Sequence, residues 1–507
     1  MFTSVLSADI EGIQARKVSV EADSQGGLPE FRMVGLLSSE VKEAKERVTR
    51  AITNSGIDIP PRKITINISP ANFRKSGTGF DLPIAVSVLG SLGLIDEDKL
   101  FGKMVVGELS LDGTVNKVNG ILPIAMLAKE EGIKTLIVPK ENAFEGAAID
   151  GVNICGVSSL SDIINRLKNN NLEFIEHINL EELLMNAFKE STLDYGDVRG
   201  QEKAKRATMI AVSGFHNLLY IGPPGSGKSM MARRIPTILN RLSVDECLEI
   251  SKIYSVIGQL HDNSLILNRP FRAPHHSITP QALVGGMGRP RPGEITLAHK
   301  GVLFLDEIAE FKKDTIEQLR QPLESKDIVI SRARERYVFP ADFMLVMAMN
   351  PCKCGYYPDR NLCLCSQTDV DRYLGKIRGP ILDRVDICVG TSKLNLNDLS
   401  FQTKTMSSAE MREKVLRAQD IQKERFKNLK INFNSQMTKN EYEEFCCLNE
   451  KCKNILNKAF EKLNMTARGY YKILKVARTI ADVENSKDIS EKHILEAIGY
   501  RNDFLDR

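Results

Sequence analysis

The stretch GPPGSGKS, from Gly222 to Ser229, has the clearest chemical meaning in the sequence. Its spacing fits the pattern G-x-x-x-x-G-K-S, in which glycines let successive backbone N–H groups turn toward bound phosphates. We expect Lys228 to reach the β- and γ-phosphates of a nucleotide and Ser229 to hold Mg²⁺. An apolar strand sequence precedes the stretch and a helix-forming sequence follows it, as this motif requires. The predicted nucleotide-binding residues are Gly222, Pro223, Pro224, Gly225, Ser226, Gly227, Lys228 and Ser229.

A second stretch, GVLFLDE, supplies acidic groups for the same chemistry. Its buried strand would carry Asp306 and Glu307 to the carboxyl edge of a sheet. We expect Asp306 to bind Mg²⁺, directly or through water, and Glu307 to orient and polarise the attacking water. A third apolar strand, FMLVMAMN, ends at Asn350, where a polar side chain needs a partner. Asn350 could position the water beside Glu307.

Two arginines are candidates for the γ-phosphate. Arg384, in GPILDRVDI, lies between two acids, and within one subunit it could pair with Asp383 or Asp386. The alternative is an arginine finger that reaches the γ-phosphate of a neighbouring subunit, with a large effect on rate. Arg468, in MTARGYYKILK, could contact the same phosphate or could form a surface salt bridge.

The segment NPCKCGYYPDRNLCLC holds four cysteines in two C-x-C pairs, namely Cys352, Cys354, Cys363 and Cys365. Four soft ligands separated by Gly, Pro, Asp and Asn can fold back into a tetrahedral thiolate site. We favour structural Zn²⁺; reduced cysteines without a ligand and an iron–sulfur cluster are the alternatives. Because the segment follows Asn350 directly, a metal there would stiffen the route from the nucleotide to the subunit interface.

Two basic stretches are candidates for contact with the backbone phosphates of a substrate, because cationic side chains bind such phosphates without sequence preference. RPFRAPHHS and the nearby GGMGRPRPGE carry His275 and His276 besides their arginines, and their prolines and histidines could instead build a rigid packed turn. SKDIVISRARERYVF reads as a basic hairpin, with a plain solvated strand face as the alternative. The candidate arginines are Arg269, Arg272, Arg289, Arg291, Arg332, Arg334 and Arg336.

The 507-residue chain needs several elements of structure to position these groups, and it is too long for one ordinary core. Residues 1–165 mix short strand-like runs with helical stretches, which is typical of an α+β domain. An Asn-rich linker follows over 166–194. Apolar strands alternate with helices over 195–395, which predicts a mostly parallel sheet covered on both faces. Residues 396–507 read as successive helices.

Composition excludes some classes of protein. The net charge of +4 is not that of a uniformly basic nucleic-acid binder, so any such contact must come from local patches or from a ring of subunits. We see no secretory signal, and the longest apolar run, LPIAVSVLGSLGLI, suits a buried helix better than a membrane span. The cytoplasm is the expected compartment, and ten cysteines there argue for free thiols or a metal.

The motifs together resemble the AAA+ ATPases of the magnesium-chelatase-like group, and the whole chain looks like the YifB/ComM type. The resemblance rests on RPFRAPHHS, GEITLAHKGVLFLDE, MAMNPCKCGYY, GPILDRVDI and KVARTIAD, which occur in the expected order. It implies ATP and Mg²⁺ as ligands, a homo-hexameric ring, and ATP-driven translocation on single-stranded or branched DNA during recombination. It also implies that Arg384 acts in trans.

Residues 1–165 resemble the domain that Lon-type proteases use for peptide cleavage, most clearly in GELSLDGTVNKVNGILPIAMLAKEEGIKTLIVPKEN. Gly79 falls at the position of the family's nucleophilic serine and Leu122 at that of its lysine, so the Ser–Lys pair is missing. Ser76, Thr78 and Lys75 leave an unusual pair open as an alternative. We expect a non-catalytic domain, for assembly or for gripping a substrate.

Three functions remain. The leading one is an ATP-driven ring motor on DNA, of the helicase or branch-migration kind, with no membrane partner. The second is a motor for metal insertion into tetrapyrroles, which the magnesium-chelatase resemblance invites and the Lon-like domain argues against. The third is a protein-remodelling or proteolytic machine.

Overall fold

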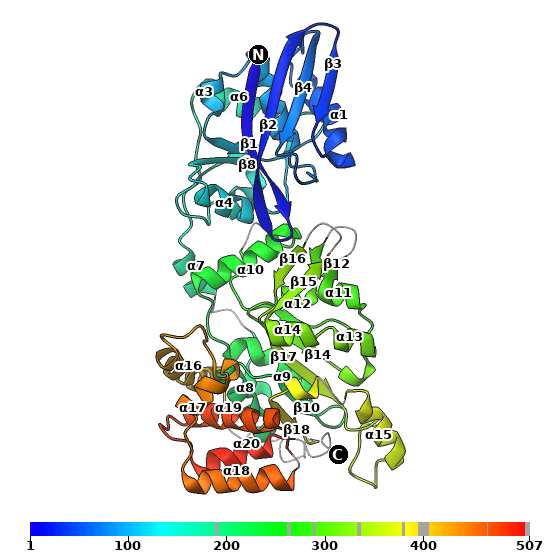
Figure 1. Ribbon diagram of the computed structural model, residues 1–507, viewed down its shortest axis with the longest axis vertical. Coiled ribbons are helices and arrows are strands. Elements are labelled where there is room, and N and C mark those ends of the chain that lie inside the picture. The colour runs from blue at the N-terminus through cyan, green and yellow to red at the C-terminus, as the bar shows by residue number, and fades with distance from the viewer. Residues whose placement is uncertain are drawn as a thin grey trace. The chain divides into compact units, whose positions relative to one another are not determined.

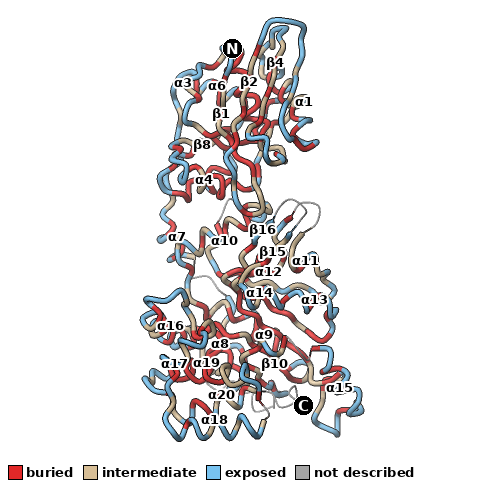
Figure 2. Tube along the Cα trace, viewed as in Figure 1, coloured by how far each residue is buried: buried red, intermediate tan, exposed pale blue. Residues whose placement is uncertain are grey.

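The computed structural model describes residues 1–187, 192–260, 265–286, 290–331, 336–377, 381–393, 405–463 and 465–501 (Figure 1). They form two compact units. Unit 1 contains Met1–Asn186 and Ser243–Leu267, and unit 2 contains Ala187–Leu242 and Asn268–Arg507. Buried residues follow the strands and the inner helices of each unit (Figure 2).

Unit 1 is built on a seven-stranded sheet in the order β3-β4-β2-β1-β5-β8-β9. Strand β2 pairs antiparallel with β1 and β4, and the other neighbours pair in parallel. The alternation in β4, RKITINIS, places Ile64, Ile66 and Ile68 on one buried face. The strands are β1 (Phe2–Glu11), β2 (Gln14–Gly26), β3 (Glu30–Val34), β4 (Arg62–Ser69), β5 (Lys103–Val105), β8 (Thr135–Pro139) and β9 (Asn153–Val157).

The helices of unit 1 pack on this sheet. The longer helices among those of residues 1–168 are α1 (Ser39–Asn54), α2 (Asp81–Ser91), α4 (Ile121–Glu130) and α6 (Leu160–Lys168). Every residue of α2 is buried, which explains why its sequence shows no polar face. The long apolar run is therefore a core helix, as its length and its interruptions predicted. After α6 the chain continues without regular structure to α7 (Leu180–Ala187), within the predicted linker.

Unit 1 also includes helix α10 (Val244–Val256), which the sequence analysis placed in the ATPase block. The helix packs against α4. The carbonyl oxygen of Ser255 accepts a hydrogen bond of 3.1 Å from the backbone N–H of Gly120, and its hydroxyl donates to Glu145. Burial raises the pKa of Glu145, and its hydrogen bonds, first that from Ser255, oppose this effect. A segment distant in sequence thus completes the packing of unit 1.

Unit 2 contains a five-stranded sheet in the order β11-β14-β17-β10-β18, in which all neighbours are parallel. The strands are β10 (Leu218–Ile221), β11 (Phe271–Arg272), β14 (Val302–Leu305), β17 (Met344–Met349) and β18 (Ile387–Gly390). The first strand along the chain, β10, lies between the last two, β17 and β18, so the strand order reverses beside it. Sheets of this kind bind ligands at the carboxyl ends of the strands beside such a reversal.

The C-terminal part of unit 2 is helical, as predicted, and its helices lie together in orange and red in Figure 1. Helices α16 and α19 both pack on α8 (Glu202–Gly214), and one hydrophobic core joins them to the parallel sheet. A change at the sheet therefore has a direct mechanical path to these helices. They are α16 (Ser408–Arg425), α17 (Lys439–Phe445), α18 (Glu450–Lys462), α19 (Ala467–Val483) and α20 (Glu491–Gly499).

Two antiparallel hairpins project from the parallel-sheet region of the chain. One joins β12 (Gly285–Gly286) to β13 (Arg291–Pro292), and the other joins β15 (Asp327–Ser331) to β16 (Arg336–Pro340). Among the described helices, none is long and apolar enough to cross a membrane.

Candidate active site

The glycine-rich loop occupies the turn between β10 and helix α9 (Lys228–Arg234). Gly225 and Gly227 have φ angles of +73° and +84°, which favour glycine. Gly222 is needed for space, because a Cβ atom there would lie 2.0 Å from Oγ1 of Thr391. The loop is thus shaped by glycines for two separate physical reasons, tight backbone turns and close packing against the end of β18.

Lys228 lies at the start of α9 with its ammonium group inside the loop. Its Nζ donates to the carbonyl oxygens of Gly222 and Pro223 at 2.7 and 2.9 Å, and to Oδ1 of Asn350 at 3.1 Å. Burial lowers the pKa of Lys228, and the negative charges of Asp306 and Glu307 oppose this effect. The amine is therefore held where several oxygen atoms converge, which is also where nucleotide phosphates are expected.

The predicted magnesium ligands lie in contact. The Ser229 hydroxyl donates to Oδ2 of Asp306 at 2.6 Å, across the carboxyl ends of β10 and β14. A hydroxyl and a carboxylate side by side are the oxygen ligands that Mg²⁺ uses at phosphate sites, so these residues fit the ion. Glu307 follows with a φ angle of +51°, and its N–H donates to Oδ1 of Asp306 at 2.9 Å. The sharp turn after β14 thus places the two acids at one edge of the sheet.

The structure brings residues from three strands to this edge: Lys228 and Ser229 after β10, Asp306 and Glu307 after β14, and Asn350 after β17. A cavity of about 700 Å³ opens beside the loop. It is lined by Gly222 and Pro223, by Tyr356 and Tyr357 from the segment after β17, and by residues that include Thr391 and Arg501. The cavity meets the loop at Gly222 and Pro223, whereas Lys228, Ser229, Asp306 and Glu307 do not line it, so it lies beside the predicted phosphate and magnesium groups and not over them.

Arg384 lies at the opposite end of the strands, where their amino termini are. It precedes β18, and its carbonyl oxygen accepts a 2.8 Å hydrogen bond from Asn217, the residue before β10. The phosphate loop follows β10, so the four residues of that strand, about 13 Å at ~3.3 Å per residue, separate the two features.

Arg468, at the start of α19, joins Arg384 at that end. Arg384 forms an ion pair with Glu324, and Nη2 of Arg468 lies 3.9 Å from Oε1 of the same carboxylate. Both arginines line a cavity of about 550 Å³ whose cationic members are Lys326, Arg384, Lys430, Arg468, Lys472 and Lys475. The predicted pair of arginines is therefore assembled around a positively charged hollow, away from the phosphate loop of the same chain.

Comparison with known proteins agrees with this architecture. The family described as "Magnesium chelatase, subunit ChlI" matches residues 194–399, "Subunit ChlI of Mg-chelatase" matches 20–142, and "Magnesium chelatase, subunit ChlI C-terminal" matches 405–501. The chain is 40% identical over 491 residues to "Competence protein ComM" of Haemophilus influenzae, covering 97% of this chain and 95% of that one. It is 39% identical over 492 residues to "Uncharacterized protein YifB" of Salmonella typhimurium, with the same shares covered.

The chain belongs to the ComM/YifB family of magnesium-chelatase-like AAA+ proteins. Membership confirms the predicted resemblance and supports an ATPase motor that uses ATP and Mg²⁺. The chain is also 25% identical over 148 residues to "Lon protease 2" of Bacillus subtilis, covering 28% of this chain and 26% of that one.

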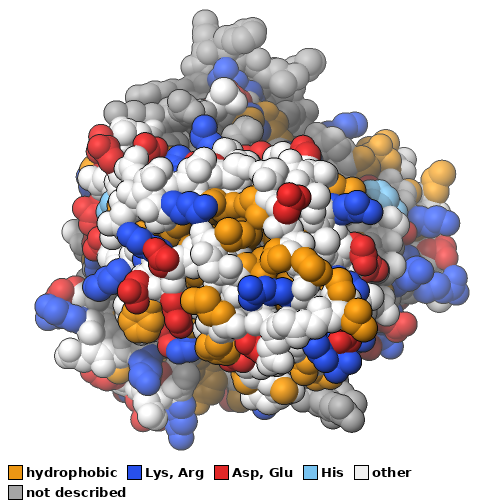
Figure 3. All heavy atoms as spheres, turned by 90° about the horizontal axis from the view of Figure 1, so that it is seen from above, with side chains coloured by type: hydrophobic (Ala, Val, Ile, Leu, Met, Phe, Trp, Pro, Cys, Tyr) orange, Lys and Arg blue, Asp and Glu red, His pale blue; other side chains and the backbone are white. Residues whose placement is uncertain are grey.

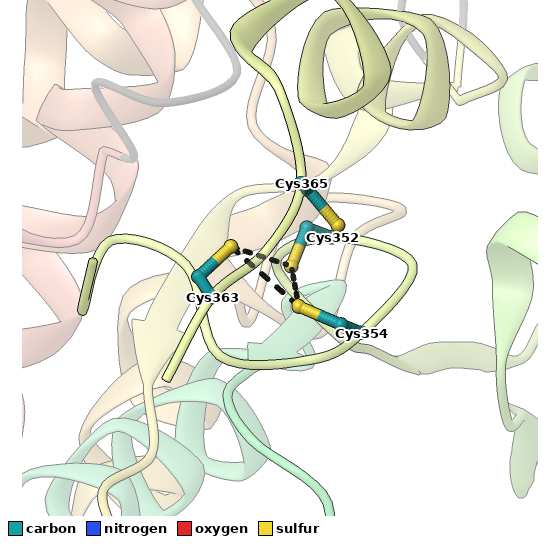
Figure 4. A group of neighbouring side chains, drawn as sticks. All are labelled: Cys352, Cys354, Cys363 and Cys365. Carbon is teal, nitrogen blue, oxygen red and sulfur yellow. Dashed lines mark hydrogen bonds between the residues drawn. The ribbon is translucent and has the colours of Figure 1, made fainter. Parts of the chain in front are cut away.

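In this ComM/YifB family member, the four cysteines predicted as metal ligands lie together. Their Sγ atoms all fall within 4.8 Å of one another, although Cys352 and Cys365 are 13 positions apart in sequence (365 − 352). Figure 4 shows them converging from two turns of one segment.

The predicted DNA contacts are placed very differently from one another. Arg269 is buried and donates to the carbonyl oxygens of Asn240 and Lys300 at 2.9 and 2.7 Å. Arg272 forms two 2.7 Å hydrogen bonds with Glu294. These contacts favour the packed-turn alternative for RPFRAPHHS, and the His275 and His276 rings also lie in contact there, with centroids 4.0 Å apart and planes tilted by 37°.

The other arginines belong to the two hairpins. Arg291 and Arg336 are exposed on β13 and β16. Arg289, Arg332 and Arg334 lie outside the described residues, in the connections of the same hairpins. On the end face drawn in Figure 3, the described basic and acidic side chains are interspersed around hydrophobic ones, with no continuous basic patch.

Gly79 and Leu122, the positions compared with the Ser–Lys pair of Lon-type proteases, carry neither a hydroxyl nor an amine. Leu122 is fully buried, and a Cβ atom at Gly79 would meet only Val106, at 3.4 Å. Nζ of the buried Lys75 donates to the Phe73 carbonyl oxygen at 3.1 Å, and the Thr78 hydroxyl donates to Glu108. The alternative pair that the sequence left open thus gains no support.

Three residues near the predicted groups were not anticipated. Gln201 donates to the carbonyl oxygens of Ser226 and Ser392 at 3.2 and 2.5 Å, so it ties the loop to the end of β18. Thr391 bonds to the Ser226 hydroxyl at 2.7 Å from the same side. Glu324 joins Arg384 to Arg468. Only Gln201 had a local signal, in the glycine-glutamine turn that precedes a helix.

Proposed function

We propose that the chain is an ATP-driven ring motor that acts on DNA, in the helicase or branch-migration class. The observation that carries this proposal is the separation of the two halves of the site. Groups suited to ATP and Mg²⁺ gather at the carboxyl edge of the sheet, and Arg384 with Arg468 gathers at the amino edge. A ring in which the amino edge of one subunit faces the phosphate loop of the next would complete each site.

The roles of the residues follow from their positions. Backbone N–H groups of the loop and Lys228 bind the phosphates, and Ser229 with Asp306 holds Mg²⁺, which neutralises charge during phosphoryl transfer. Glu307 polarises the attacking water, and Asn350 helps to position it. Arg384 of the neighbouring subunit stabilises charge on the γ-phosphate, and in doing so it exchanges its partner Glu324 for the nucleotide.

The β15–β16 hairpin is the proposed DNA contact. Its exposed Arg336 and the neighbouring Arg332 and Arg334 would face backbone phosphates, and a ring would repeat this cluster around its channel. The related Haemophilus protein is called a competence protein, which is consistent with work on DNA. We propose unit 1 as a non-catalytic Lon-like domain that serves assembly or substrate grip.

The test is ATP hydrolysis measured with single-stranded, duplex and four-way-junction DNA at fixed salt. The proposal predicts that at least one DNA form raises the rate severalfold. If none of the three DNA forms changed the rate of ATP hydrolysis and a tetrapyrrole-chelatase partner raised it, the metal-insertion function would be favoured instead. ATP-dependent cleavage of casein would favour the protease alternative.

Replacing Arg332, Arg334 and Arg336 together with alanine is expected to weaken DNA binding at least ~10-fold at low salt, because about three phosphate contacts are lost and the salt dependence becomes shallower. Basal ATP hydrolysis should not change. Fluorescence anisotropy with labelled single-stranded DNA at several salt concentrations measures this effect.

The matched control replaces three exposed lysines of α18 with alanine, namely Lys451, Lys453 and Lys458. It removes the same charge from a surface that the proposal does not use. Equal losses of DNA affinity in both triple variants would show that only net charge matters, and the hairpin assignment would be wrong.

A further inference from the structure

We propose that Cys352, Cys354, Cys363 and Cys365 form a tetrahedral Zn²⁺ site that braces the phosphate loop. The cysteines lie in the segment between β17 and α15 (Gln367–Gly375), which contains no described helix or strand over residues 351–366. A segment of this length needs some other source of order.

The sulfur positions match a metal site. Sγ of Cys352 lies 3.3 Å from that of Cys354 and 3.7 Å from that of Cys363, and the Cys354–Cys363 distance is 3.5 Å. Four sulfurs at ~2.3 Å from one tetrahedral zinc would stand about 3.8 Å apart. A disulfide requires about 2.05 Å, and all four cysteines are free thiols here. The group is thus spaced for a shared ligand and not for two disulfides.

The segment has almost no apolar core of its own. Leu364 is 94% exposed and Leu362 is 51% exposed, whereas Cys352 and Cys363 are buried. The cysteines therefore occupy the inside that leucines would fill in a segment held by hydrophobic packing. A small irregular segment of this composition is typically held by a structural metal.

Backbone turns present the two cysteine pairs to one point. Gly355 has a φ angle of +88°, and its N–H donates to the Cys352 carbonyl oxygen at 3.0 Å. The Tyr357 N–H donates to Sγ of Cys352 at 3.4 Å. The Cys363 N–H donates to the carbonyl oxygen of Asp359 at 2.8 Å. An N–H group directed at a sulfur offsets thiolate charge, as the surroundings of metal thiolates usually do.

The first turn also packs on the phosphate loop. A Cβ atom at Gly355 would lie 2.5 Å from Cδ of Pro224, so the Gly355 backbone packs closely against the Pro224 ring. Asn350, which contacts Lys228, immediately precedes the segment. Zinc at the four cysteines would fix this turn and, through Pro224 and Asn350, the shape of the loop. This consequence rests on the proposed ATP site, whereas the metal site does not.

The first test measures metal in the full-length chain purified without chelators. We expect about one zinc ion per chain, and Co²⁺ added after zinc is removed should produce the visible absorption of a tetrahedral cobalt thiolate. Cys354→Ser and Cys363→Ser should lose the bound metal, and Cys447→Ser, at an exposed thiol outside the group, should keep it. A chain without stoichiometric metal, or one that binds iron with an iron–sulfur absorption band, would overturn the zinc site.

The second test measures nucleotide affinity, and it uses the intact chain in case the serine variants fail to fold. Removing zinc should raise the Kd for ATP severalfold, and adding Zn²⁺ back should restore it. Gly355→Ala keeps all four cysteines and so should keep zinc, yet it should weaken ATP binding by a similar factor. Full zinc occupancy with unchanged ATP affinity in Gly355→Ala would disprove the claim that the zinc-bound turn fixes the shape of the phosphate loop. An unaltered chain that holds stoichiometric zinc but does not bind ATP would count against the ATP site and not the metal site.

Discussion

Lys228→Ala is expected to reduce ATP hydrolysis at least ~100-fold, because it removes an ammonium group held inside the phosphate loop, and preorganised charges of this kind supply ~3 kcal/mol or more. ATP binding should weaken as well, since the amine contacts the phosphates before and during the reaction. Steady-state phosphate release and binding of a fluorescent ATP analogue measure the two effects separately.

Lys313→Ala provides the matched control. Lys313 belongs to the same unit, its side chain is 83% exposed, and its Nζ lies 3.8 Å from Oε1 of Glu317. Its removal should leave turnover unchanged. If Lys228→Ala hydrolysed ATP as fast as this control, the assignment of the glycine-rich loop would be wrong.

Arg384→Ala is expected to reduce turnover about 10³-fold, the effect of losing an arginine finger, while ATP binding changes little. The reason is positional: the guanidinium lies at the amino edge of the sheet, so it serves the nucleotide of a neighbour. Single-turnover hydrolysis at saturating ATP measures the loss, and a nucleotide-binding assay measures the retained affinity.

Arg384→Lys is the conservative comparison. It keeps the charge near Glu324 but loses the planar fork that grips a phosphate, so we expect it to recover only part of the rate. Glu324→Ala keeps both arginines and removes the carboxylate that Arg384 and Arg468 share. An Arg384→Ala variant that kept its rate and lost ATP affinity instead would indicate a binding role within one chain.

The phosphate loop, the two acids and Asn350 could be predicted because each sits in a short local pattern. A buried strand followed by glycines or acids is visible in sequence, and parallel strands bring their carboxyl ends to one edge. The parallel sheet and the helical C-terminal region were predicted correctly for the same reason, since their apolar periods are local.

Other features depend on contacts between distant residues. Arg269 looks like a surface cation in sequence, yet its hydrogen bonds to Asn240 and Lys300 hold it inside. Helix α10 reads as part of the ATPase block, and only its packing against α4 places it in unit 1. Glu324 has no motif at all, because its importance comes from two arginines 60 and 144 positions away (384 − 324 and 468 − 324).

The central claim is that ATP held by one subunit is hydrolysed with the help of Arg384 from the next, and mixing two inactive variants tests it most directly. Glu307→Gln should bind ATP without hydrolysing it, yet it retains Arg384; Arg384→Ala retains Glu307. In mixed assemblies, an Arg384→Ala subunit beside a Glu307→Gln subunit regains a complete site, so the mixture should hydrolyse ATP well above the sum of the separate variants. Activity in the mixture equal to that sum, with mixed assemblies verified, would contradict the claim.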